Sequence, residues 1–379
     1  MQKKIMLVFG TRPEAIKMAP LVHALRAEPS HFEVNICITG QHRQLLDQVL
    51  KTFNIVPDIN LDLMKKDQDL FDITANVLVA MKNVFKEYKP NIVIVHGDTS
   101  TALSTAIAGF YAGIPIAHVE AGLRSNNLFA PFPEEFNRQT VSKIAQWHFT
   151  PTKLSREHLL KEKIADTSIT VTGNTVIDSL QWVLKRIDAD TNLRDFVDTK
   201  ITSILPFDWR KETFVLITGH RRENFGDGLQ NICNSVRELS LLYPKLHFVY
   251  SVHLNPNVQQ PVNDILTGLD NVHLLEPINY DLFVYLLKYC HLVLTDSGGI
   301  QEEAPSLGKP VLVMRDVTER PEAVSAGTVK LVGTNKDIIV SCVSRLLTDT
   351  AYYKSMSKAH NPYGDGNSCS RIVDVLRKI

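Results

Sequence analysis

Three acidic residues in the first half of the chain stand where a reactive carboxylate can meet a ligand. Asp98 and Glu120 each follow a short apolar run, and Glu134 follows Pro133 at the expected start of a helix. In open α/β sheets, ligands bind beyond the carboxyl ends of the strands, so Asp98 and Glu120 are expected beside a ligand. Carboxylates placed in this way can act as general acids and bases.

Each of these carboxylates also has a structural interpretation. Asp98 could cap a helix that begins at Thr99, a contact worth about 1 kcal/mol. Glu134 suits the positive end of a helix dipole and could pair with Arg138, four residues further on. Glu120 fits a structural role less well, because a carboxylate that ends an apolar strand is expected to be buried or at a cleft.

A second group of residues suits a phosphate-containing anion. Ser297, Gly298 and Gly299 are expected to open a helix, where glycine permits close approach and free N–H groups face the anion. Cationic residues follow other expected strands, namely Arg12, Lys17, His220 and Arg320. Together these residues suggest a diphosphate held between two domains. The sequence has neither a Walker lysine motif nor a Gly-x-Gly-x-x-Gly motif after the first strand, which disfavours ATP hydrolysis and a bound NAD.

The elements that must position these residues are short apolar strands that alternate with amphipathic helices. This alternation is typical of parallel sheets with helices on both faces. A polar stretch around Asp188–Arg210 lacks periodicity and is expected to separate two such halves. The expected strands are Ile5–Phe9, Val34–Ile38, Ile92–His96, Ile116–Glu120, His148–Thr150, Phe214–Thr218, Phe248–Val252, Val272–Leu274, Leu292–Thr295, Val311–Met314 and Val329–Val332.

The two halves of the chain also resemble each other. IMLVFGTRPE and FVLITGHRRE are both an apolar strand followed by Gly, one residue and Arg. The prediction is therefore an α/β protein with two Rossmann-like, doubly wound domains facing a central cleft. We expect the first domain at 1–172, with a C-terminal helix at 362–379 packing back on it, and the second at 173–361.

Composition and charge narrow the classes of partner. The 379 residues include 41 Lys and Arg and 41 Asp and Glu, and this balance argues against nucleic acid or a membrane as the main partner. The five cysteines are far apart, without a Cys-x-x-Cys pair, so we expect neither disulfides nor a zinc cluster. No apolar stretch is long enough to span a bilayer, and we expect a cytoplasmic protein.

Several longer motifs resemble one known family. GTRPEAIKMAP, HGDTSTALS, HVEAGLRS, PFPEEFNRQ, TGHRRENFG and LTDSGGIQEEAPSLGKPVL are similar to the bacterial non-hydrolysing UDP-N-acetylglucosamine 2-epimerases, and the resemblance covers essentially the whole chain. It implies a two-domain fold of the glycosyltransferase-B type, a homodimer, and no metal or redox cofactor. It also implies reversible conversion of UDP-N-acetylglucosamine to UDP-N-acetylmannosamine, a precursor of cell-surface polysaccharides.

The chemistry of such a reaction explains the need for several acids. The C2 hydrogen of the sugar is not adjacent to a carbonyl, so direct deprotonation is disfavoured, and the NAD motif that an oxidative route requires is missing. Elimination of UDP to 2-acetamidoglucal and re-addition remains, which needs a base at one face, an acid at the other and cations for the diphosphate. By resemblance the catalytic residues are Asp98, Glu120, Glu134, His220 and Arg138, and the sequence leaves open which carboxylate serves which face.

The resemblance also assigns binding positions. Those that match the nucleotide-sugar site are Arg12, Lys17, Phe283, Ser297, Gly298, Gly299, Glu303 and Arg320. A carboxylate such as Glu303 suits ribose hydroxyls, and Arg320 suits the diphosphate. Phe283 is expected to form a wall of the uracil pocket.

Relatives in this family are often activated by their own substrate at a second site. The matching positions here are Gln41, His42, Gln44, Arg221 and His253. Two positions depart from the pattern: Asp67 stands where some relatives carry a basic residue, and Ile278 stands where a polar residue is common. A carboxylate at Asp67 would repel a diphosphate, which puts the second site in doubt.

Three other functions remain open from the sequence. A hydrolysing epimerase of the same fold would release N-acetylmannosamine and UDP, and the test is whether water or UDP adds to the glycal. A glycosyltransferase of this fold would need an acceptor groove, and the balanced charge and three carboxylates count against it. A non-catalytic nucleotide-sugar sensor would not need the intact set of acids.

Overall fold

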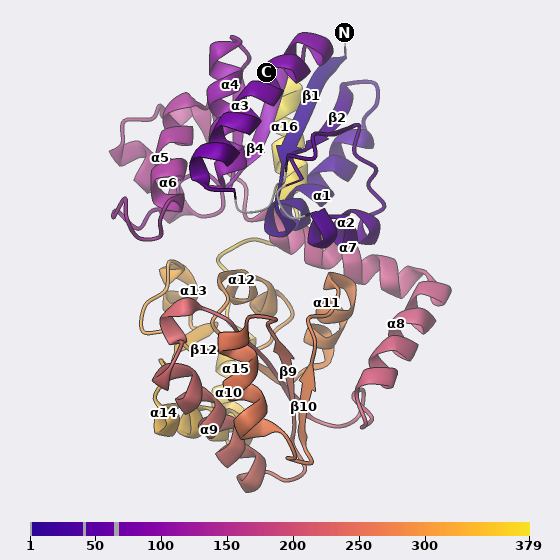
Figure 1. The fold of residues 1–379 in the computed structure, drawn as a ribbon, viewed down its shortest axis with the longest axis vertical. Coiled ribbons are helices and arrows are strands. Elements are labelled where there is room, and N and C mark those ends of the chain that lie inside the picture. The colour runs from indigo at the N-terminus through magenta and orange to yellow at the C-terminus, as the bar shows by residue number, and fades with distance from the viewer. Residues whose placement is uncertain (1, 41–42, 64–67) are drawn as a thin grey trace. The chain divides into compact units, whose positions relative to one another are not determined.

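The computed structural model describes residues 2–40, 43–63 and 68–379. The chain divides into two compact units, Met1–Trp182 together with Tyr363–Ile379, and Val183–Pro362. In the described part of the chain, each unit contains one parallel sheet flanked by helices (Figure 1). No helix there is long and apolar enough to cross a bilayer.

The sheet of the first unit is parallel, with the strand order β3-β2-β1-β4-β5-β6-β7. The strands that follow β1 are added on one side as far as β3, and those from β4 onward are added on the other side. The strand order therefore reverses between β1 and β4, which are neighbours in the sheet but far apart in the sequence. Such a reversal is where ligands bind in doubly wound folds. The strands are β1 (Lys3–Phe9), β2 (Phe32–Ile38), β3 (Ile59–Asn60), β4 (Ile92–His96), β5 (Ile116–Val119), β6 (Trp147–Thr150) and β7 (Ile169–Val171).

Helices cover both faces of this sheet, so β4 is buried along its whole length. The C-terminal helix α16 packs against α1, and its yellow ribbon lies among the indigo elements of the N-terminus in Figure 1. At the start of α16, the backbone N–H groups of Ser368 and Cys369 donate hydrogen bonds to the carboxylate of Asp178 on α7. The helices are α1 (Arg12–Arg26), α2 (Arg43–Thr52), α3 (Leu70–Tyr88), α4 (Ser100–Tyr111), α5 (Glu134–Ile144), α6 (Lys153–Lys161), the 3-10 helix η1 (Asp166–Ser168), α7 (Thr175–Ala189) and α16 (Ser368–Lys378).

The second unit repeats the same topology. Its parallel sheet has the order β10-β9-β8-β11-β12-β13, and the reversal lies between β8 and β11. Each of the six residues of β8 is buried. The strands are β8 (Phe214–Gly219), β9 (His247–Val252), β10 (Val272–Leu275), β11 (Leu292–Thr295), β12 (Val311–Val313) and β13 (Val329–Leu331).

One helix of the second unit lies in a stretch of sequence that shows no apolar periodicity. The polar stretch around Asp188–Arg210 contains the helix α8 (Thr191–Ile204), which is capped by Asp190 and buries only Val197 and Ile201. A buried face that narrow leaves little apolar periodicity to detect. The other helices of the second unit are the 3-10 helix η2 (Arg222–Asn224), α9 (Asp227–Leu242), α10 (Pro256–Leu266), α11 (Tyr280–Tyr289), α12 (Gly298–Ser306), α13 (Pro321–Ala326), α14 (Lys336–Thr348) and α15 (Thr350–Ser357).

Candidate active site

A buried carboxylate joins the ends of β1 and β4 in the first unit. Glu14, which is 1% exposed, accepts hydrogen bonds from the backbone N–H groups of Gly10 and Thr11 through Oε2, at 3.0 and 2.8 Å. Its Oε1 accepts from the hydroxyl of Thr99 at 2.7 Å. The loop that carries Arg12 and the loop that carries Asp98 are thereby fixed to the same side chain.

Asp98 lies two residues after the end of β4 and pairs with a buried arginine. Arg138 NH2 lies 2.6 Å from Asp98 Oδ2, and the side-chain amide of Asn137 donates to the Asp98 carbonyl at 2.8 Å. The cap of α4 is supplied by Thr99, whose hydroxyl accepts from Ala102 N, so the capping role considered for Asp98 is taken by its neighbour. The Asp98 carboxylate is left to face Arg138.

The carboxyl group of Asp98 is affected by the charges of Glu120, Glu134 and Arg138. Burial raises the pKa of Asp98, Arg138 opposes this, and the negative charges of Glu120 and Glu134 raise it further. Glu134 is the first residue of α5, and its buried Oε2 has no hydrogen-bond partner among the described residues. Arg138 forms ion pairs with Asp98 and Glu135, and among the described residues the pair between Arg138 and Glu134 that the spacing suggests is not formed.

Glu120 is held in place by groups from three different elements. The side chains of Lys17 on α1 and Asn174 before α7 both donate to its Oε2, the latter at 2.7 Å. His96 Nε2 lies 3.8 Å from the same oxygen. Burial lowers the pKa of His96 to about 4, so this imidazole is neutral near neutral pH. Glu120 itself has a φ of 62°, a left-handed conformation that ends β5 at Val119.

This arrangement provides acid–base chemistry with charge compensation. The first unit brings together Asp98, Glu120, Glu134, Lys17 and Arg138, and it places Arg12 at the first position of α1. A carboxylate can accept a proton in its ionised form, and its raised pKa makes Asp98 easier to protonate than an ordinary aspartate. In the described ranges no cluster of three His, Cys, Asp or Glu side chains has the geometry of a metal site.

In the second unit, Asp296 organises the end of β8. Asp296 is 1% exposed and accepts from the backbone N–H groups of His220 and Arg221 at 2.9 and 2.8 Å. The Asn224 side chain donates to the same oxygen at 3.2 Å. The His220 ring is 43% exposed, with Nδ1 3.7 Å from Asp296 Oδ1, and it stacks on His253 at 5.2 Å. Burial lowers the pKa of His220, opposed by the charge of Asp296.

The beginning of α12 is packed against a buried arginine. Arg320 donates through Nε to Glu302 at 2.6 Å and through NH1 to Glu319 at 2.7 Å. A Cβ at Gly298 would lie 2.5 Å from Arg320 NH1, so any other residue would displace the guanidinium. Burial raises the pKa of Glu319, but Arg320 and Arg315 oppose it and lower this pKa to about 2. The Arg320 guanidinium therefore lies beside the first N–H groups of α12, an arrangement that suits an anion.

The other expected binding residues lie in the segments that follow strands β10 and β11. Ser297 is the N-cap residue of α12, and its side chain makes no capping hydrogen bond. Gly299 follows Gly298 in the first turn, where a Cβ would have ordinary space. Glu303 is buried one turn further on and accepts from the hydroxyl of Tyr280 at 2.6 Å. Phe283 lies on α11 and is half-buried.

The expected second site is only partly described. Gln41, His42 and Asp67 lie outside the described residues, and Gln44 lies in α2 without a described side chain. Arg221 NH2 is 3.7 Å from Glu319 Oε1, and His253 is exposed beside His220.

Several residues of these networks were not singled out from the sequence. His96, Asn174, Glu135 and Glu302 contact predicted site residues. Asp296, which accepts the backbone N–H groups of His220 and Arg221, directly follows the expected strand Leu292–Thr295. His96 and Asp296 follow the strand-end rule and could have been found from it. Asn174 and Glu302 carry no such local signal.

The chain is similar to proteins of one family along nearly its whole length. The family model described as UDP-N-acetylglucosamine 2-epimerase matches residues 23–377. The Escherichia coli K12 protein named UDP-N-acetylglucosamine 2-epimerase is 54% identical over 374 residues, covering 99% of this chain and 98% of that protein. The crystal structure of UDP-GlcNAc 2-epimerase from Neisseria meningitidis bound to UDP-GlcNAc has 48% identity and a TM-score of 0.92, covering 99% of this chain and all of that chain.

The fold is shared more widely than the sequence. The spinosyn rhamnosyltransferase SpnG has 14% identity and a TM-score of 0.56, covering both chains fully. This likeness and the two parallel sheets confirm the α/β prediction, with two Rossmann-like domains of the glycosyltransferase-B type. The match across nearly the whole chain confirms the expected family, and the chain belongs to the UDP-N-acetylglucosamine 2-epimerases.

Proposed function

We propose that the chain catalyses reversible C2 epimerisation of UDP-N-acetylglucosamine to UDP-N-acetylmannosamine without net hydrolysis. The observation that carries this proposal is the convergence of Asp98, Glu120 and Glu134 in one unit, with Lys17 and Arg138 beside them. Several carboxylates are what a reaction needs when it must remove a proton from one face of a carbon and return it to the other. The family and the Neisseria structure bound to UDP-GlcNAc support the substrate.

The proposed reaction proceeds by elimination and re-addition. A carboxylate takes the C2 proton, the C2–H electron pair forms the C1–C2 double bond, and the C1–O bond breaks with its electrons moving to the UDP phosphate. The products of this half-reaction are 2-acetamidoglucal and UDP. In the return step a phosphate oxygen of UDP attacks C1, and C2 receives a proton from an acid on the opposite face.

The residues divide this work between two groups. In the first unit, Asp98, Glu120 and Glu134 are the proton-transfer candidates, and Arg138 stabilises the charge on Asp98. In the second unit, Arg320 and the N–H groups of Gly298 and Gly299 suit the diphosphate that gains charge when C1–O breaks.

The remaining binding residues suit the nucleoside and the departing phosphate. We assign Glu303 to the ribose hydroxyls, Phe283 to the uracil and His220 to the phosphate, with Arg12 as a further cation. The chemistry needs no redox cofactor, because hydrogen leaves and returns as a proton. Arg221 and His253 remain proposed members of a second, activating substrate site.

We also propose a homodimer that forms through α3 and α4. This face has a groove of about 720 Å³ lined by residues that include Leu78, Phe85 and Ile114. Val79 and Tyr111 beside it are 64% and 75% exposed. Exposed apolar surface of this kind marks protein interfaces, and most soluble oligomers are symmetric homo-oligomers.

The cellular setting follows from the product and the thiols. UDP-N-acetylmannosamine would supply cell-surface polysaccharide synthesis. The five cysteines are all buried and free, which agrees with a reducing cytoplasm.

The test is incubation of the purified protein with UDP-N-acetylglucosamine in D2O, without NAD or added metal, followed by proton NMR. We expect UDP-N-acetylmannosamine with deuterium at C2. Free N-acetylmannosamine with UDP would instead show a hydrolysing enzyme, and an unchanged substrate would point to a transferase that lacks its acceptor.

A further inference from the structure

Glu135 is a fully buried carboxylate one residue after Glu134. It is 0% exposed and accepts the backbone N–H groups of Ser125 and Asn126 at 2.9 and 3.1 Å. Gln139 donates to it at 2.8 Å. Burial raises the pKa of Glu135, but these hydrogen bonds and the charge of Arg138 lower it below its ordinary value. Glu135 is therefore an ionised side chain inside the protein.

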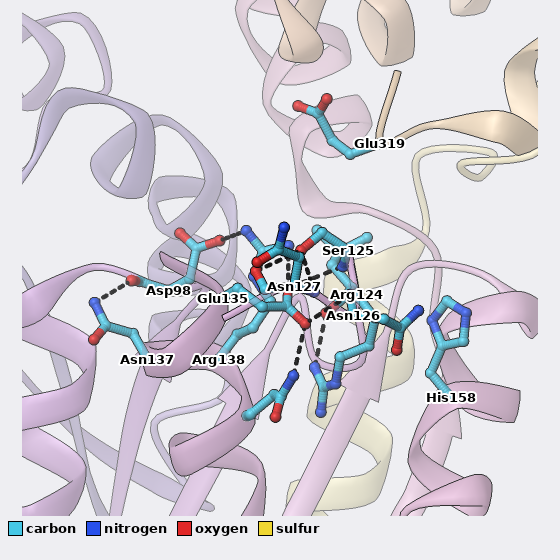
Figure 2. A network of polar contacts seen from close by, with 12 residues as sticks. Asp98, Arg124, Ser125, Asn126, Asn127, Glu135, Asn137, Arg138, His158 and Glu319 are labelled. Atoms are coloured by element: carbon cyan, nitrogen blue, oxygen red, sulfur yellow. Dashed lines mark hydrogen bonds and ion pairs between the residues drawn. The ribbon is translucent and has the colours of Figure 1, made fainter. Parts of the chain in front are cut away.

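Arg138 lies between this buried carboxylate and Asp98 (Figure 2). Its NH2 is 2.6 Å from Asp98 Oδ2, and its NH1 is 3.5 Å from Glu135 Oε2. The two terminal nitrogens of one planar guanidinium thus face two different carboxylates. A planar fork can bridge two acids in a fixed geometry, whereas a lysine ammonium acts as a point charge.

The backbone of Arg138 is held by a separate chain of contacts. Ser142 Oγ donates to the Arg138 carbonyl at 2.8 Å, and Arg124 donates to Ser142 Oγ at 3.0 Å. Arg124 is itself paired with Glu162 at 2.5 Å. These contacts fix the main chain of α5, whereas the terminal nitrogens of the guanidinium are contacted by Asp98 and Glu135.

We propose that Glu135 is a positioning residue that acts through Arg138 to hold the guanidinium against Asp98. The same carboxylate accepts the N–H groups of Ser125 and Asn126, so it connects these two loop residues to the arginine that faces Asp98. This inference rests on the proposed function, in which Asp98 takes part in proton transfer.

A purely structural role for Glu135 makes a different prediction. If Glu135 only satisfies the loop N–H groups, its loss lowers stability and the fraction of folded protein, while each folded molecule turns over normally. If Glu135 orients Arg138, turnover per folded site falls while UDP binding is kept. Misplacement of a charged group by about 1 Å is enough for an effect of about 100-fold.

The test compares Glu135→Gln, Arg138→Lys and the double variant. Competent sites are counted by calorimetric titration with UDP, and kcat and KM for UDP-N-acetylglucosamine are measured per competent site. Gln139→Ala is the matched control, because it removes a hydrogen bond to Glu135 without touching Arg138. We expect kcat to fall about 10- to 100-fold in both single variants, with the Kd for UDP unchanged, and kcat of the control to stay within about twofold.

The double variant separates the two roles if Glu135→Gln is poorly folded. Residues that act as one unit have non-additive effects. We expect the double variant to lose little more activity than Arg138→Lys alone, and multiplied losses would overturn the proposal. A kcat per competent site within about twofold of wild type in Glu135→Gln would also overturn it. An inactive wild-type protein would instead remove the proposed function on which the inference rests.

Discussion

The contact between Gly298 and Arg320 allows the proposed phosphate site to be tested by adding a single methyl group. In Gly298→Ala the new Cβ would lie 2.5 Å from NH1 and 2.7 Å from Cζ of Arg320, well inside van der Waals contact. Arg320 has little room to yield, because it is 7% exposed and is hydrogen-bonded to Glu302 and Glu319. The guanidinium must therefore leave at least one of these partners.

The expected cost follows from the contact that is lost. A hydrogen bond to a charged group contributes about 1.5–3 kcal/mol, and each 1.4 kcal/mol is a factor of ten in affinity. If the displaced guanidinium no longer meets the diphosphate, the Kd for UDP should rise by about 10- to 100-fold. Isothermal titration with UDP measures this change directly.

Gly228→Ala is the control for the effect of alanine on helix stability. Gly228 is the second residue of α9, and a Cβ there would meet Thr334 at an ordinary 3.4 Å. Replacing a helical glycine by alanine favours a helix by about 1 kcal/mol at most. We expect this variant to bind UDP normally. Unchanged UDP affinity in a folded Gly298→Ala protein would refute the assignment of Arg320 to the diphosphate.

Three further predictions concern the first unit. Glu120→Gln should lower kcat by about 10²- to 10⁴-fold with an unchanged circular dichroism spectrum, and an unfolded variant would show that Glu120 has a structural role instead. Because the pKa of Asp98 is raised in the folded protein, protonation of this side chain stabilises the fold. This stabilisation is present at low pH and is lost as pH rises through the folded-state pKa. Asp98→Asn removes this pH dependence, so the free energy of unfolding of the variant relative to wild type should shift in favour of the variant as pH rises from below the ordinary pKa of aspartate to neutral; urea titrations at both pH values measure this, and an equal difference at both would contradict it. Tyr111→Asp should shift the protein from dimer to monomer in light scattering, whereas a mass unchanged from wild type would place the interface elsewhere.

Most of the fold could be predicted because its signal is local. Continuous apolar runs such as Ile92–His96 are typical of the buried strands of a parallel sheet, and this run is a strand in the structure. Strands β3 and β7 were missed because two or three residues are too short to show a period. The prediction that a strand extends to Glu120 was one residue too long, because the positive φ of Glu120 turns the chain out of the sheet. The sequence does not show which single non-glycine residue adopts a left-handed backbone conformation.

The candidate site was less predictable than the fold because pairing is not local. The strand-end rule placed Asp98 and Glu120 correctly at the edge of the sheet, but it did not indicate their partners. Spacing suggested that Arg138 pairs with Glu134 on the same helix, whereas the structure pairs it with Asp98, forty residues earlier. Asn174, which binds Glu120, comes from a loop fifty-four residues later. Such contacts depend on topology and not on neighbouring sequence.

The hydrogen bonding of the first unit indicates what its site is built to bind. Buried polar atoms in proteins nearly always have a hydrogen-bond partner. In the described part of the chain, His96 Nε2, Glu134 Oε2 and Arg138 Nε have none, and all three belong to residues in or beside the acid cluster. An imidazole, a carboxylate and a guanidinium can together satisfy hydroxyl, amide and phosphate groups, which are the groups of a nucleotide-sugar. Burial also disfavours the ionised form of Asp98, so the acid cluster contains polar groups that the protein itself leaves unsatisfied, as the proposed chemistry requires.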